Sequence, residues 1–135
     1  MEKILVAVET NTSSFWSLVY ALNLAKRIQV TISILLVSPP MPPDEKKTNE
    51  TGDPFPIKSK IEKLITEGRS SGIHIEYYHT SGSFKEEIIE FIQRKKIDLL
   101  VIEKQITKNV SELIEEIKLR TYCRIELVQP KVINS

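Results

Sequence analysis

The sequence predicts an α/β fold: a doubly wound, open parallel sheet of five strands in the order 3-2-1-4-5, with four helices on its two faces. Two observations predict it. Short apolar, β-branched runs alternate strictly with longer segments whose apolar residues recur at helical spacing. The run over 99–102 contains no polar residue, which is typical of a strand that is covered on both faces. We expect residues 1–135 to form this one domain.

The first half of the chain reads as strand, helix, strand. Residues 4–8 predict a buried strand that ends at Glu9, and the small polar residues after it favour a helix start. Lys26 and Arg27 should lie in the last helical turn, where positive charge complements the helix dipole. Residues 30–37 predict the second strand. The apolar side chains expected to pack the helix on the sheet are Leu18, Ala21, Leu22, Ala25 and Ile28.

A proline-rich polar stretch over 38–56 separates the second strand from the next helix. Its prolines and charged residues cannot bury an apolar face. We expect a mobile loop here. A lid over a ligand and a partner-binding segment are the alternatives that the sequence leaves open.

The third strand lies between two amphipathic segments. Apolar spacing predicts a helix over 57–68, and polar alternation over 73–78 predicts a strand near a sheet edge. Ser83 followed by Glu86 matches a capping box, in which the serine caps the helix and the glutamate returns the bond. That helix should end at the basic residues up to Lys96.

The last third of the chain supplies the central strand and one edge of the sheet. After the strand over 99–102, Asn109 and Glu112 repeat the capping pattern for a last helix. Residues 124–128 predict the final strand.

Charge, cysteine content and apolar run length exclude several classes of protein. Nineteen Lys and Arg against 18 Asp and Glu leave a net charge of +1, so no overall field draws the chain to nucleic acid. No apolar run approaches membrane-spanning length. A single cysteine, Cys123, excludes an internal disulfide and suits a reducing compartment. We expect a cytoplasmic protein without a nucleic-acid partner and without membrane insertion.

The order and spacing of these segments resemble the universal stress protein family over nearly the whole chain. The resemblance implies the adenine nucleotide alpha hydrolase-like fold and a role in the stress response. The residues that carry it are Lys3 to Val8 with the acidic residue after them, Ser14, Leu18, Tyr20-Ala21, Leu24 to Arg27, Gly82, Ile97 to Ile102 and Cys123.

The same resemblance points to a missing nucleotide motif. Family members that bind ATP carry an Asp after the first strand and a Gly-x-x-Gly…Gly-Ser/Thr motif after the fourth. Here the acidic residue is Glu9, and the loop over 104–108 contains no glycine. Glycines let successive N–H groups curl around phosphate oxygens, whereas Glu103 would set a carboxylate against a triphosphate. We therefore predict that the chain does not bind ATP and carries no cofactor.

The candidate site is the crevice at the carboxyl ends of the central strands, where open α/β sheets bind ligands. Glu9 could hold a ribose hydroxyl or a cation, or could be a solvated carboxylate at a helix N-terminus. Glu9 and Glu103 could also face each other as an acid/base or metal-binding pair, although no further ligand is evident nearby. The residues of this remnant nucleotide crevice are Glu9, Thr10, Asn11, Val37 and Glu103.

The final strand is the expected dimer interface, because family members commonly dimerise through it. Arg124 and Glu126 flank Ile125, so an antiparallel copy centred there would set each arginine beside the other chain's glutamate. Leu127 completes this interface. The alternative is that the charges protect an exposed edge against pairing.

Three functions follow. The leading interpretation is a non-enzymatic, regulatory or protein-interaction homodimer that does not bind ATP and whose protein partner the sequence does not identify. The first alternative binds ATP or AMP through Thr10, Asn11 and the loop over 104–108. The second alternative, an enzyme, has no visible nucleophile with a base.

Overall fold

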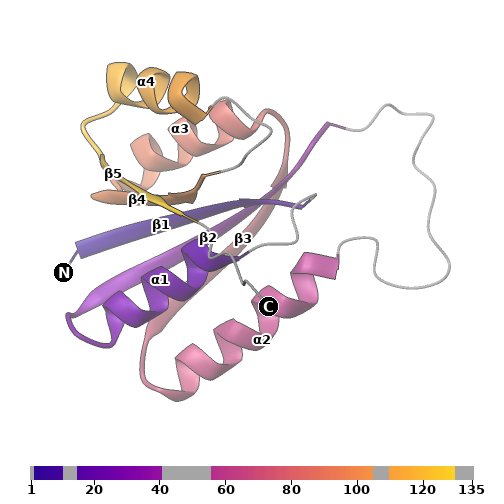
Figure 1. Cartoon of the computed structure of the whole chain (residues 1–135), viewed down its shortest axis with the longest axis vertical. Helices are drawn as coiled ribbons and strands as arrows, with labels where there is room; N and C mark the ends of the chain where they lie inside the picture. The colour runs from indigo at the N-terminus through magenta and orange to yellow at the C-terminus, as the bar shows by residue number, and fades with distance from the viewer. Residues whose placement is uncertain (1, 11–14, 41–55, 105–109, 130–135) are drawn as a thin grey trace, which may run out of the picture.

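The computed structural model describes residues 2–10, 15–40, 56–104 and 110–129 and places a parallel sheet between two layers of helices (Figure 1). The sheet has five strands in the order β3-β2-β1-β4-β5, so the predicted fold is confirmed. The strands are β1 (Glu2–Glu9), β2 (Val30–Ser38), β3 (His74–Ser81), β4 (Leu99–Glu103) and β5 (Arg124–Val128). The helices are α1 (Trp16–Ala25), α2 (Pro56–Ser70), α3 (Phe84–Lys95) and α4 (Val110–Arg120).

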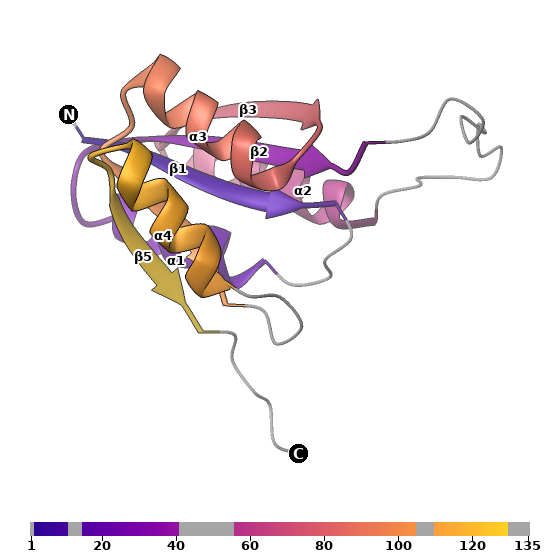
Figure 2. The same ribbon diagram turned by 90° about the horizontal axis from the view of Figure 1, so that it is seen from above.

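Helices α1 and α2 cover one face of the sheet, and α3 and α4 cover the other (Figures 1 and 2). The central strands supply both cores because successive side chains of a strand point to opposite faces. Along β1, Ile4, Val6 and Val8 enter the core beneath α1 and α2, whereas Leu5 and Ala7 enter the core beneath α3 and α4. No described helix is long and apolar enough to cross a bilayer.

The end of α1 differs from the prediction. The helix stops at Ala25, where its last turn tightens: the Lys26 N–H donates to the Asn23 carbonyl at 3.3 Å and the Arg27 N–H to the Leu24 carbonyl at 3.0 Å, each three residues back along the chain. Lys26 is therefore the C-cap rather than part of the last turn. Ile28 lies outside the helix and is 47% exposed, so its predicted place in the buried stripe is wrong.

Strand β3 runs further toward the carboxyl edge than the alternation over 73–78 predicts. It stays in register with β2 to the end, where His79 pairs with Leu36 and Ser81 with Ser38. Backbone pairing with a buried neighbour extends the strand through polar residues. The predicted loop over 38–56 lies outside the described residues from 41 to 55, as does the predicted cap Asn109.

The predicted cap of α3 forms, but only half of the capping box does. The Ser83 hydroxyl oxygen accepts from the Glu86 backbone N–H at 3.5 Å. The Glu86 carboxylate accepts instead from the Arg120 guanidinium at 3.0 Å, which ties the first turn of α3 to the end of α4.

Candidate functional site at the carboxyl edge of the sheet

Three of the predicted site residues come together where β1 and β2 end. Glu9 pairs with Val37 in the strand register, and the Thr10 backbone N–H donates to the Val37 carbonyl at 3.0 Å. Glu9 is 9% exposed and Thr10 is 5% exposed. Asn11 lies outside the described residues. The strand ends therefore form a buried polar corner at the edge of the sheet where we expected the crevice.

Glu103, at the end of β4, contacts the N-terminus of α1. One oxygen of its carboxylate, Oε1, accepts from the backbone N–H of Trp16 at 2.8 Å and from that of Ser17 at 3.3 Å. The N-cap residue of α1, Phe15, makes no side-chain cap bond. A negative charge at this end of a helix is favoured by the free N–H groups and by the helix dipole. Glu103, 87 positions from Trp16, thus supplies a cap to α1. Residues 11–14 of the polar cluster that we expected to start this helix lie outside the described residues.

Glu9 and Glu103 lie on opposite faces of the sheet. Ala7 packs in the core beneath α3 and α4, and strand alternation places Glu9 on that same face. Val101 packs in the core beneath α1 and α2, and Glu103 follows it there, in contact with α1. The hypothesis of a facing acid/base or metal-binding pair is therefore wrong. Among the described residues, no group of three or more acidic, histidine or cysteine side chains could hold a metal ion.

A second pair of polar side chains meets at the ends of β2 and β3. The Ser38 hydroxyl oxygen lies 2.8 Å from the His79 Nε2 atom. Ser38 is 8% exposed, and its backbone carbonyl accepts from the Gly82 N–H at 2.9 Å. Burial lowers the pKa of His79, and the positive charge of Lys58 on α2 lowers it further, so the ring is neutral at pH 7. Sequence reasoning missed this pair, because its two members lie 41 positions apart.

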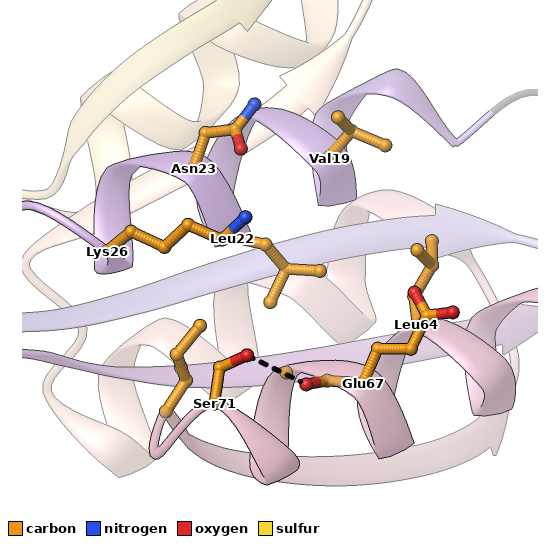
Figure 3. A pocket seen from close by; sticks show the side chains of 9 residues that line it. Val19, Leu22, Asn23, Lys26, Leu64, Glu67 and Ser71 are labelled. Atoms are coloured by element: carbon orange, nitrogen blue, oxygen red, sulfur yellow. Dashed lines mark hydrogen bonds between the residues drawn. The ribbon is translucent and has the colours of Figure 1, made fainter.

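A groove between α1 and α2 is a separate feature of the surface (Figure 3). Its volume is about 170 Å³, below the size of ordinary small-molecule sites. Figure 3 shows Leu22 and Lys26 of α1 and Leu64 and Glu67 of α2 among the side chains that line it. None of the predicted site residues lines this groove.

The predicted dimer residues lie on β5, an outer strand of the sheet. Ile125 and Leu127 pack partly against the core beneath α3 and α4, and Glu126 is exposed. The Arg124 guanidinium already pairs with the Glu2 carboxylate of the same chain at 2.8 Å. The pairing expected across a dimer therefore competes with an ion pair inside each chain.

Comparison with known proteins gives one family and one fold. The sequence model of the universal stress protein family matches residues 1–114. A universal stress protein in complex with cAMP superposes with a TM-score of 0.68 at 17% identity, over 96% of this chain and 98% of that one. No significant match is found among curated proteins.

Two further solved structures are similar. A universal stress protein family protein from Arabidopsis thaliana with AMP bound has a TM-score of 0.58 and 16% identity, over 98% of this chain and 94% of that one. The universal stress protein from Archaeoglobus fulgidus in complex with dAMP has a TM-score of 0.56 and 17% identity, over 97% of this chain and 98% of that one.

Proposed function

The chain belongs to the universal stress protein family, and on that premise we propose that it acts as a regulatory or protein-interaction homodimer that neither binds ATP nor catalyses a reaction. The observation that carries this proposal is the position of the Glu103 carboxylate on the first N–H groups of α1. In an open α/β sheet, those N–H groups and the adjoining strand ends are where an anionic ligand is held. Here the chain supplies the anion itself.

Electrostatics supports the exclusion of ATP. A phosphate oxygen placed about 4 Å from the Glu103 carboxylate would be repelled by about 4 kcal/mol at an effective dielectric constant near 20. Millimolar binding corresponds to about 4 kcal/mol of favourable free energy. One like-charge contact of this size would therefore cancel binding in that range.

A thermal-shift titration with ATP and Mg²⁺ tests this proposal. At about 10 mM ATP we expect the melting temperature to move by less than about 1 °C, whereas a site with a dissociation constant near 0.1 mM would raise it by several degrees. Glu103→Gln is the matched variant, because it keeps a hydrogen-bond acceptor and removes the charge. A rise of several degrees in the wild type would overturn the proposal, even if the variant rises further.

A second candidate function is the binding of a smaller adenine nucleotide. It is favoured by the relatives crystallised with cAMP, AMP or dAMP and by the corner of Glu9, Thr10 and Val37, which lies on the sheet face opposite Glu103. The sequence assigns its phosphate contacts to Asn11 and the loop over 104–108, of which Asn11 and residues 105–108 lie outside the described residues. The same titration with AMP separates the two candidates: a saturable rise that Glu9→Gln abolishes would favour this one.

The homodimer is proposed through β5, whose outer edge no described strand pairs. In an antiparallel pair centred on Ile125, Arg124 of each chain would lie beside Glu126 of the other. Each arginine would then pair both with that Glu126 and with Glu2 of its own chain. Sedimentation velocity of the wild type and of Glu126→Arg tests this interface. We expect a dimer that the substitution dissociates, because it would set two arginines side by side. A monomeric wild type would reject the interface.

A further inference from the structure

The pair of Ser38 and His79 has the geometry of a nucleophile and its base. The two side chains leave neighbouring strands at the carboxyl edge of the sheet, with 2.8 Å between the hydroxyl oxygen and Nε2. In the ring tautomer that carries its proton on Nδ1, Nε2 accepts from the serine hydroxyl. This is the contact by which a histidine activates a serine. The function proposed above does not use it.

The surroundings favour the neutral, proton-accepting form of the ring. His79 is exposed to solvent at its strand end, while Ser38 beneath it is 8% exposed. Among the described residues, Lys58 in the first turn of α2 places a positive charge near the ring, and this charge opposes protonation of the imidazole. The same positive charge would attract an oxyanion that develops at Ser38.

We propose that Ser38 is an acylation site, at which the hydroxyl activated by His79 takes the acyl group of a small activated carboxylic ester. The Ser38 oxygen forms a bond to the acyl carbon, and the hydroxyl proton passes to His79 Nε2. The bond from the acyl carbon to its alcohol or phenol leaving group breaks. The imidazolium then gives up this proton to the leaving group or to water, which restores the neutral ring.

The backbone around Ser38 predicts one acylation rather than turnover. In serine hydrolases of the α/β-hydrolase fold, the N–H after the nucleophile stabilises the oxyanion, but Pro39 follows Ser38 and has no N–H. The nearby Gly82 N–H is already donated to the Ser38 carbonyl. Attack on an activated ester expels a good leaving group, whereas hydrolysis of the serine ester must expel an alkoxide. The acyl group should therefore stay on Ser38, which agrees with a regulatory rather than an enzymatic role.

The test uses 4-nitrophenyl acetate on the full chain at neutral pH. We expect one equivalent of acetyl on the Ser38 peptide, located by mass spectrometry, and release of one equivalent of 4-nitrophenolate. Hydroxylamine should remove this acetyl, because it cleaves esters and leaves acetyl-lysine intact. This experiment is independent of the ATP titration, so the two proposals can fail separately.

Two variants distinguish a role of His79 as the base from a merely structural role at this edge of the sheet. His79→Gln keeps a hydrogen-bonding group beside Ser38 but removes the base, so acetylation should slow by about tenfold or more. Ser81→Ala is the matched control, because Ser81 pairs with Ser38 in the register, is exposed and should leave the rate unchanged. No ester on Ser38 in the wild type, an unchanged rate in His79→Gln, or Ser38-dependent turnover well beyond one equivalent would each overturn the proposal.

Discussion

The N-termini of α1 and α3 are stabilised in opposite ways. Helix α3 is capped by Ser83, the residue that immediately precedes it, at 3.5 Å. Helix α1 has no cap bond from its N-cap side chain and is held by Glu103 of β4, at 2.8 and 3.3 Å. A local cap stabilises one helix, whereas the cap from β4 also ties α1 to the sheet.

Removal of the Glu103 carboxylate should have the largest effect on stability. Glu103→Ala removes two charge-assisted hydrogen bonds to α1 and should lower the free energy of unfolding by about 2 kcal/mol. Urea denaturation followed by circular dichroism measures it. Glu115→Ala, at an exposed position of α4, is the control and should change the value by less than about 0.5 kcal/mol. Equal losses in both variants would mean that the contact contributes nothing specific.

The fold is predictable from the sequence because its signals are local. The run over 99–102 is wholly apolar, and the structure buries it on both faces. The capping serine of α3 lies next to the helix that it caps. The two errors, the early end of α1 and the longer β3, concern the ends of elements. At such ends, hydrogen bonds to neighbouring residues and strands determine where the helix or strand stops.

The site is less predictable, because its contacts depend on register and on strand face. Topology alone predicts a ligand position at the end of β4, and Glu103 is the last residue of that strand. Which face Glu103 occupies depends on the pairing of Val6 with Val101, which the sequence does not reveal. For the same reason, neither the contact with Trp16 nor the pair of Ser38 and His79 could be predicted.

A neutral isostere sharpens the comparison by separating charge from hydrogen bonding. Glu103→Gln keeps an oxygen that can accept from Trp16 but loses the attraction of a full charge to the helix end. We expect a loss of about 1 kcal/mol in the free energy of unfolding, half of the alanine effect. A loss equal to that of Glu103→Ala would assign the whole effect to charge. No loss would assign it to the hydrogen bonds.

The local cap of α3 should have a smaller effect. Ser83→Ala removes a bond that is long, at 3.5 Å, so we expect a loss of about 0.5 kcal/mol, the low end for N-caps. Ser83→Asp is the matched substitution, since it restores an acceptor and should recover the loss. If Ser83→Ala costs more than Glu103→Ala, the ranking of local and long-range caps is wrong.

A pH titration probes the α1 and α2 face without altering either cap and should show the smallest effect. The folded chain holds the pKa of His79 below its ordinary value of 6.5, mainly by burial and also through Lys58. The unfolded chain therefore binds the proton more readily than the folded chain. The contribution of His79 to the free energy of unfolding is fully present above pH 6.5 and is lost as the pH falls through the folded pKa. The His79→Gln variant should lack this component, so its stability should fall less than that of the wild type between pH 6.5 and pH 5. Because His79 is partly exposed, solvent screens the effect, and the difference between the two denaturation series should be small but of this sign. Parallel curves for the two proteins would mean that the ring near Ser38 is no less basic in the folded chain than in the unfolded one.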